Sequence, residues 1–356
     1  MDKVFSEKIN ILKAIAIALV VSGHLEFRIF DMFPPYSFQI ALFFFISGML
    51  FKDKYLNNVQ EFIKRRSKSL LLLYFIYSAF YLIVTIIIAK LTGKFWGMEI
   101  SLKNFFITPF LNGHQFDLSC PMWFVPQLFI TLLTFLFIER NIKDKLKTPI
   151  YTLMCFASVP LSNTFPLTPV FLVVIRTMFS LFFVHLGHLY TTKINGKVNI
   201  FTPQILAFVI CLQAVIWHFN RDFLPSQGVG LSYVLVWARF DNQLIVPVLT
   251  SITGIWFSLF FVEITYNYLK NIKFIKLMGE NTYHIMANHL FVMYLITAII
   301  FKLNGIPISE RSSHDIYWIF NPIQNTYLYF VITMIVTTYT GAGLKKLNRL
   351  LKKKPA

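Results

Sequence analysis

The chain has 356 residues, of which 56% are hydrophobic, 17% aromatic and only 14% charged, and its mean hydropathy is +0.62. Soluble domains carry about 25% charged residues, so this composition excludes a soluble globule and favours a polytopic membrane protein whose apolar exterior faces lipid. The formal charge is +17, but the basic residues form short clusters between apolar segments. This pattern indicates membrane topology, and we expect no nucleic-acid partner.

Ten apolar segments follow one another along the chain, and most are long enough to cross ~30 Å of hydrocarbon as a helix. They lie near 9–30, 36–51, 69–89, 121–138, 148–163, 169–190, 201–217, 244–268, 282–302 and 325–343. The sequence therefore predicts an all-α fold, a polytopic membrane helical bundle with about ten transmembrane helices. The stretch 231–238 is apolar but too brief to cross, so we expect it to lie at the interface or to re-enter.

The distribution of lysine and arginine predicts the orientation of these helices. With the N-terminus inside, the predicted cytoplasmic segments hold 24 of the 33 basic residues and the predicted outer segments hold 8. Cytoplasmic loops carry an excess of Lys and Arg, so both termini are predicted to be cytoplasmic. We expect one transmembrane domain over 1–343 and a basic cytoplasmic tail over 344–356 that contacts lipid headgroups.

Lys13 and His24 are ionisable residues inside the first segment, where such groups are costly and mark functional sites. They are eleven residues apart, which is about three helical turns, so both lie on one face about 16 Å apart along the axis. Such a face can hold an anionic group at one end and carry out proton chemistry at the other. The structural alternative is a snorkelling lysine and an interfacial histidine.

Two further groups each have a structural and a functional interpretation. Ser47 and Gly48 end the aromatic run of the second segment, where small residues favour close packing with another helix. Arg65, Arg66 and Lys68 belong to a basic cluster just before the third segment. This cluster is either a cytoplasmic anchor or a clamp for phosphate groups, which guanidinium groups match in bidentate geometry.

Histidines in the sixth and ninth segments are candidates for proton chemistry or metal binding. His185 and His188 share a helix face, and Arg176 points roughly the opposite way. In the ninth segment, His284 shares a face with Asn288, whereas His289 points away from His284. No acidic ligand or close cysteine joins these histidines, so we expect no metal site.

Five motifs, in order along nearly the whole chain, resemble the acyltransferase-3 family of membrane acyltransferases, in particular members that O-acetylate bacterial surface polysaccharides. The motifs are Lys13 to His24, Phe45-Ile46-Ser47-Gly48, Trp123-Phe124, Arg176 through Gly187, and Gly279 with Asn281-Thr282 and His289.

The chain departs from the family at one motif. An Arg-x-x-Arg pair followed by proline is frequent before the third span of relatives. Here the equivalent is Arg65-x-x-Lys68, and Leu73 or a neighbour replaces the proline. Lysine keeps the positive charge but loses the bidentate fork of arginine.

The resemblance implies a multi-pass O-acetyltransferase of the bacterial cytoplasmic (inner) membrane, with acetyl-CoA as donor, a glycan or its lipid-linked precursor as acceptor, and no bound cofactor. His24 would act as the general base or receive the acetyl group itself. The donor phosphates would be bound by Lys13, Arg65, Arg66 and Lys68. The acceptor or the developing oxyanion would be bound by Ser47, Trp123, Arg176 and His289.

The main alternative is a multi-span transporter or exporter of a glycan or small metabolite. In that case Arg176, Glu263 and the span histidines would line an ion or substrate path. Transporters often consist of two similar halves, and the sequence shows no such repeat, which favours the enzyme. A structural or sensory membrane protein is the third alternative.

Overall fold

The computed structural model describes residues 2–25, 27–111, 113, 115–220, 230–241 and 243–352. Helices make up 77% of the structure, and the described residues form no strand. The predicted all-α class is confirmed.

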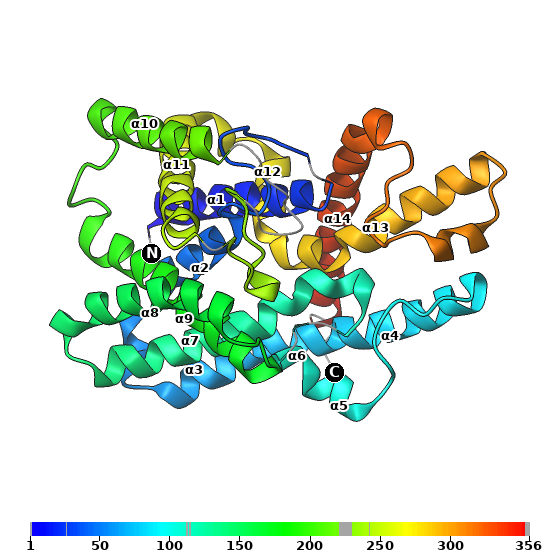
Figure 1. The fold of residues 1–356 in the computed structure, drawn as a ribbon, viewed down its shortest axis with the longest axis horizontal. Helices are drawn as coiled ribbons and strands as arrows, with labels where there is room; N and C mark the ends of the chain where they lie inside the picture. Colours follow the sequence, from blue (N-terminus) through cyan, green and yellow to red (C-terminus); the bar gives the residue numbers. More distant parts are fainter. Residues whose placement is uncertain are drawn as a thin grey trace.

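Each of the ten predicted apolar segments coincides with a helix (Figure 1). These helices are α1 (Lys3–Gly23), α2 (Gln39–Met49), α4 (Leu72–Thr92), α7 (Phe124–Asn141), α8 (Asp144–Thr164), α9 (Pro169–Leu189), α10 (Pro203–Phe219), α11 (Val246–Leu269), α13 (Thr282–Leu303) and α14 (Pro322–Lys352). The short α-helices between them are α3 (Val59–Arg66), α5 (Leu102–Phe106), α6 (Thr108–Leu111) and α12 (Lys273–Glu280). Short segments of 3-10 or π helix are η1 (Asp53–Leu56), η2 (Ser67–Leu71), η3 (Asp117–Trp123), η4 (Tyr190–Ile194), η6 (Leu235–Trp237) and η7 (Ile308–Ser313).

Six helices within the described residues are long and apolar enough to cross a membrane. They cover Val59–Thr92, Asp117–Asn141, Pro169–Ile194, Val246–Leu269, Thr282–Leu303 and Pro322–Leu351. The apolar helices α2 and α10 are shorter, with 11 and 17 residues. These findings indicate a multi-pass membrane protein, and the count of ten spans stays a prediction.

The exterior of α4 shows how the bundle accommodates lipid. Ile76, Ile83 and Ile87 are each more than half exposed, at 56%, 60% and 51%. Residues seven and eleven positions apart lie close to one helix face, so α4 presents an apolar stripe outward. In water this stripe would be unfavourable, whereas in a bilayer it contacts hydrocarbon.

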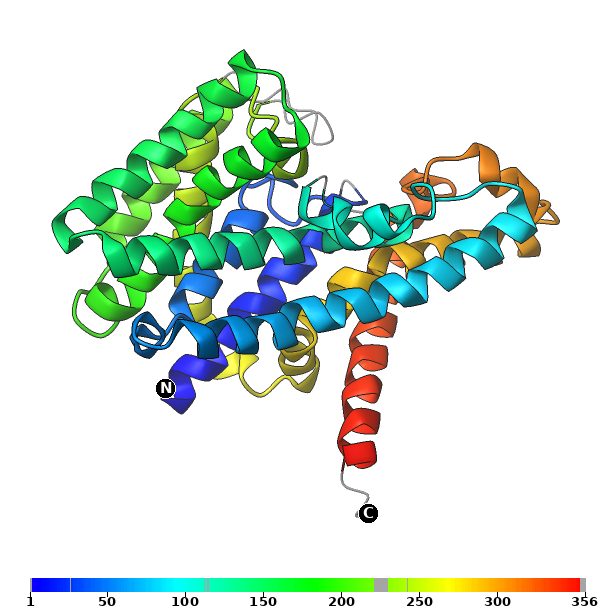
Figure 2. The same cartoon turned by 90° about the horizontal axis from the view of Figure 1, so that it is seen from below.

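Helix α1 lies at the centre of the bundle, where it contacts α2, α11, α12, α13 and α14. Helices α7, α8 and α9 pack together on one side of it, and α13 and α14 pack together on the other (Figure 1). The first turn of α1 and the last turn of α14 lie towards the same side of the molecule, the lower side of Figure 2. An even number of membrane spans places the two ends of a chain on the same side of the membrane.

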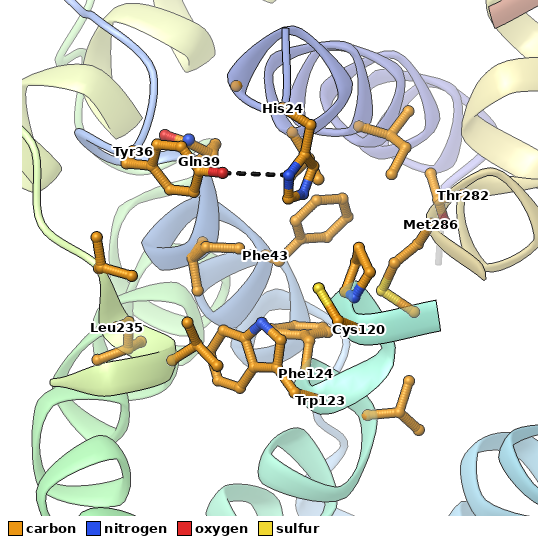
Figure 3. A pocket seen from close by; sticks show the side chains of 18 of the residues that line it. His24, Tyr36, Gln39, Phe43, Cys120, Trp123, Phe124, Leu235, Thr282 and Met286 are labelled. Carbon is orange, nitrogen blue, oxygen red and sulfur yellow. Dashed lines mark hydrogen bonds between the residues drawn. The ribbon is translucent and has the colours of Figure 1, made fainter. Parts of the chain in front are cut away.

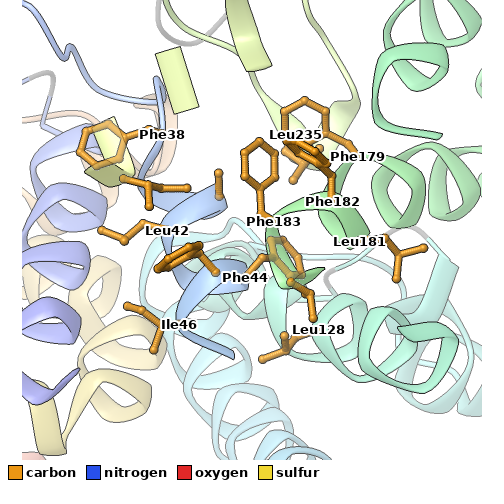
Figure 4. Close-up of a cluster of buried hydrophobic side chains, with 14 of the residues drawn as sticks. Phe38, Leu42, Phe44, Ile46, Leu128, Phe179, Leu181, Phe182, Phe183 and Leu235 are labelled. Carbon is orange, nitrogen blue, oxygen red and sulfur yellow. The ribbon is translucent and has the colours of Figure 1, made fainter. Parts of the chain in front are cut away.

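Helices α2 and α9 cross so closely that their backbones touch, within the largest cluster of buried hydrophobic side chains (Figure 4). A Cβ atom on Gly48 would lie 1.9 Å from the carbonyl oxygen of Val184, and one on Gly187 would lie 1.9 Å from that of Phe45. Neither position has room for a side chain. The predicted packing role of the small residues that end the second segment is confirmed for Gly48.

Candidate functional site

A cavity of about 870 Å³ lies beside α1, between α2, the start of α7 and the start of α13 (Figure 3). Four of the predicted site residues line it: Lys13, His24, Ser47 and Trp123. The predicted common face of Lys13 and His24 is confirmed, because Ile17 and Val20, which lie between them at helical spacing, line the same cavity.

Most of the stretch 231–238, for which the sequence left two membrane positions open, is buried in the bundle. Residues 233–237 line the cavity, and Leu231 and Ser232 are buried. The hydroxyl of Tyr233 bonds to Ser251 Oγ at 2.9 Å, and its backbone N–H donates to the carbonyl of Tyr36 at 3.0 Å. The segment thus forms one wall of the cavity.

His24 lies at the C-terminal end of α1, where the helix stops at Gly23 and the backbone N–H of His24 donates to the carbonyl of Ser22. The chain then runs in an irregular course to α2, through Pro34 and Pro35, which cannot donate backbone hydrogen bonds. Because α1 ends here, His24 projects from a helix terminus into the cavity, with no further helical turn above it.

Tyr36 holds the His24 ring. Its hydroxyl lies 3.2 Å from His24 Nδ1, and this hydrogen bond is drawn in Figure 3. Tyr36 has φ of +65°, a left-handed conformation that is costly for a bulky residue. Strained residues of this kind gather at functional sites, where the surrounding structure enforces them. The geometry therefore assigns Tyr36 a part in orienting His24.

Two further rings pack against His24. The ring of Tyr317 stacks on it at a centroid distance of 5.3 Å and an interplanar angle of 4°. The ring of His289 lies 4.9 Å away. His289 is fully buried, and its Nδ1 donates to the carbonyl oxygen of Ile285 at 3.0 Å. In the neutral ring, Nε2 is therefore an acceptor, and it has no hydrogen-bond partner among the described residues.

The loop between α13 and α14 delivers Tyr317 to the site. The Tyr317 hydroxyl bonds to Cys120 Sγ at 2.8 Å, and burial raises the pKa of this hydroxyl, so it stays protonated at neutral pH. Arg311 anchors the loop from beneath, because its guanidinium donates to the carbonyls of Asp315 at 2.7 Å and Ile316 at 3.1 Å. Arg311 is fully buried, with its charge over the rings of Tyr294 and Trp96.

Arg176 lies behind the cavity wall and is not one of the residues that line it. Its guanidinium donates to the carbonyls of Leu111 and Val236 and lies 5.2 Å from the centre of the Trp123 ring. It thereby ties α9 to two connecting segments and supports Trp123. Direct contact of Arg176 with an acceptor stays a prediction.

The basic residues before the third span differ in their surroundings. Arg65 is exposed and pairs with Glu61 at 2.8 Å, and Lys68 is exposed. Arg66 is partly buried over the ring of Phe62, and its charge acts on Lys13. The helix makes a π turn here, η2, a distortion that is frequent at functional sites. Of the cluster, Arg66 is therefore best placed to act together with Lys13.

The other span histidines lie outside the residues that line the cavity, and His284 and Asn288 contact one hydroxyl, as their predicted common face requires. His284 bonds to Tyr77 of α4 at 2.6 Å, and Asn288 donates to the same hydroxyl at 3.1 Å, whereas His289 faces His24. His185 bonds to Thr148 at 2.9 Å. The expectation that no acidic residue joins these histidines is wrong, because Glu139 lies 3.6 Å from His185 and Asp53 lies 3.4 Å from His188. In the part of the chain that the structure describes, no three potential ligand side chains gather closely enough to hold a metal.

The residues that the transporter alternative requires do not share a path. Glu263 pairs with Lys8 at 2.6 Å at the end of α11, and both are partly exposed. Neither Glu263 nor Arg176 lines the large cavity.

Sequence reasoning missed three residues that contact or support His24, namely Tyr36, Tyr317 and Cys120. Cys120 precedes Pro121 at the opening of the fourth predicted span, and the chemistry of that opening was assigned to Trp123 alone. Tyr36 follows two prolines, which is a signal for an irregular connection but not for contact with a histidine. Tyr317 lies in a loop whose sequence carries no motif.

One family model matches nearly the whole of the chain. The family model described as an acyltransferase domain, acyltransferase-3, matches residues 6–342. No curated protein and no solved structure matches the chain. The match includes every residue that lines the cavity, together with the motifs that place Lys13 and His24 on one face. The chain therefore belongs to the acyltransferase-3 family of membrane proteins.

Proposed function

We propose that this protein transfers an acetyl group from cytoplasmic acetyl-CoA to a hydroxyl of a cell-surface glycan or its lipid-linked precursor. The observation that carries the proposal is the single cavity that runs from Lys13 to His24. The two residues are eleven positions apart, about 16 Å along the helix, so an extended thioester arm anchored at Lys13 can bring its acetyl group to His24. Membership of an acyltransferase family supports the reaction class.

In the proposed reaction, His24 is the general base. With its Nδ1 proton donated to the Tyr36 oxygen, the Nε2 lone pair is free for the acceptor hydroxyl. As Nε2 takes the hydroxyl proton, the acceptor oxygen attacks the thioester carbonyl. Collapse of the tetrahedral intermediate breaks the carbon–sulfur bond, and the thiolate takes the proton from the imidazolium. The products are an acetyl ester and free CoA thiol.

The residues around His24 have complementary roles in this proposal. His289 is fully buried and does not line the cavity, so in this proposal its ring packs against His24 and helps to fix the position of the catalytic imidazole. The protonated Tyr317 hydroxyl is a neutral donor beside His24 and can stabilise the oxyanion. If instead His24 Nε2 attacks the thioester, the acetyl group resides on the imidazole before transfer to the same hydroxyl.

We further propose ten spans in a bacterial inner membrane, with both termini cytoplasmic. The coincidence of ten helices with ten apolar segments, the bias in basic residues and the shared face of the two ends support this topology. The basic cluster and Lys13 then face the cytoplasm, where acetyl-CoA is found.

The test is mass spectrometry of the surface glycan from cells that produce the protein, the His24→Asn variant or neither. We expect acetyl esters only with the unaltered protein, because an amide cannot take the proton and loss of a general base costs roughly 10²–10⁴ in rate. His188→Asn, in a histidine outside the cavity, is the matched control. Near-normal acetylation by His24→Asn at equal membrane levels would contradict the proposed mechanism.

A further inference from the structure

Lys345 lies in the stretch that the sequence assigned to a basic, lipid-facing tail, but α14 continues through it without a break to residue 352. Residues 353–356 of that stretch lie outside the described residues. Lys345 is partly buried, whereas its neighbour Lys346 is exposed. The ammonium group of Lys345 donates to the backbone carbonyl of Glu280, the last residue of α12. A lysine that only contacts lipid headgroups would be exposed, and it would not bond to the backbone of another helix.

Close packing of α12 and α14 carries Lys345 towards the inner end of the cavity. Helix α12 touches α1 through Gly279, where a Cβ would lie 2.0 Å from the carbonyl oxygen of Asn10. Asn10 also donates from its side chain to the carbonyl of Lys276 at 2.9 Å. Lys13, which lines the cavity, is one helical turn beyond Asn10. The carbonyl that Lys345 contacts is thus next to the α1–α12 contact.

Helix α14 packs against the start of α13 as closely as α12 packs against α1. A Cβ on Gly341, one turn before Lys345, would lie 2.8 Å from Cβ of His284. Glycine at this position lets α14 approach α13, and Thr282 and Tyr283 at the start of α13 line the cavity. The backbone geometry therefore places Lys345 near the end of the cavity that Lys13 lines, although Lys345 is not itself a lining residue.

Three cations from three separate helices, Lys13 of α1, Arg66 of α3 and Lys345 of α14, lie towards this end, and of these only Lys13 lines the cavity itself. The positive charges of Lys345 and Arg66 are near enough to act on Lys13. The carboxylate of Glu280 also acts on Lys345, but Glu280 is exposed. Like charges brought together in a partly buried place repel one another, and a polyanion bound between them relieves that cost.

We propose that Lys345, with Lys13 and Arg66, binds the phosphate groups of the acyl donor. The inference rests on the proposed function and deepens it, because it adds a binding residue from the last helix to the donor site. A phosphate-bearing anion fits the cluster, since lysine and arginine bind phosphate oxygens as point charge and fork respectively. The same chemistry could come from an anionic lipid headgroup, and the experiment separates the two sources.

The experiment measures CoA binding to the purified protein in neutral detergent by titration calorimetry. Lys345→Gln removes the charge but keeps a side-chain amide that can donate to the Glu280 carbonyl. We expect CoA binding to weaken about tenfold, the size of one lost charge-assisted contact. Lys346→Gln, one residue along the same helix and exposed, is the matched control and should bind as the unaltered protein does. Lys345→Arg should retain most of the affinity.

Each outcome decides a separate point. If the unaltered protein binds CoA and Lys345→Gln binds equally well, the inference is overturned while the proposed donor stands. If Lys345→Gln loses binding of phosphatidylglycerol vesicles but not of CoA, the cluster is a lipid site and the inference is again overturned. If the unaltered protein binds no CoA at all, the proposed function is wrong in its donor, and the inference fails with it. In turnover assays we expect a raised KM for acetyl-CoA with kcat unchanged.

Discussion

Replacing Tyr36 by phenylalanine tests whether the hydrogen bond to His24 Nδ1 serves catalysis. The variant keeps the ring and the backbone conformation and removes only the hydroxyl, which lies 3.2 Å from Nδ1. A neutral hydrogen bond contributes about 0.5–1.5 kcal/mol, which corresponds to roughly two- to thirteenfold in rate. If His24 becomes positively charged as it takes the proton, the bond is charge-assisted and contributes about 1.5–3 kcal/mol. The expected loss then reaches roughly 150-fold.

The location of this effect in the kinetics matters as much as its size. Because the bond strengthens only as charge develops on His24, we expect Tyr36→Phe to lower kcat and to leave KM for both substrates nearly unchanged. Acetyl transfer from labelled acetyl-CoA to the isolated glycan precursor provides the assay. Tyr266→Phe, which removes a hydroxyl bonded to Glu7 outside the cavity, is the control. A change in kcat below about twofold, with the protein folded, would refute the orienting role of Tyr36.

Three further predictions follow from the packing, the basic cluster and the topology. Gly187→Ala should lower the free energy of unfolding in detergent by about 3 kcal/mol, because the new Cβ would lie 1.9 Å from a backbone carbonyl oxygen. Gly343→Ala is the control and should be neutral in the same thermal melts, because its Cβ would have no neighbour within 4 Å. Arg66→Ala should weaken CoA binding about tenfold, and Arg65→Ala should weaken it less because Arg65 already pairs with Glu61. Equal losses of affinity for the two variants in titration calorimetry would contradict this distinction. In a cysteine-free background, a cysteine at position 346 should be protected from a membrane-impermeant reagent and one at position 310 labelled, and the reverse pattern would overturn the proposed orientation.

Helical periodicity predicted which residues share a face, because a face is a local property of the helix. Lys13 and His24 line one cavity, and His289 points away from His284, as their spacing required. The ends of helices were less predictable. The sequence predicts that the first apolar segment continues to residue 30, but α1 ends at Gly23, since apolar residues also occur in the connection that follows, where Leu25 is buried and Ile29 is exposed.

Contacts made by loops could not be predicted from spacing. Tyr317 reaches His24 across about 290 residues of sequence, and nothing local marks it. Arg176 is a second example, in which the sequence indicated the residue but not its partners. The sequence identified it as a costly buried charge, but its partners are the carbonyls of Leu111 and Val236, which lie in two distant connecting segments. Only the folded arrangement shows that such a charge is satisfied by backbone.

The arrangement of charge along the cavity bears on how a membrane enzyme could use a polyanionic donor. Lys13 and the cations near it lie at one end, neutral imidazole and tyrosine side chains gather at the other, and Ile17, Val20 and Phe43 line the space between. Moving phosphates through that apolar stretch would be costly, because an unpaired charge loses its hydration there. A donor bound in the proposed way keeps its charge at the inner end and extends only an uncharged arm towards His24. The arm and the acetyl group that lie in the apolar stretch are then both neutral, so the reaction needs no path for ions across the membrane.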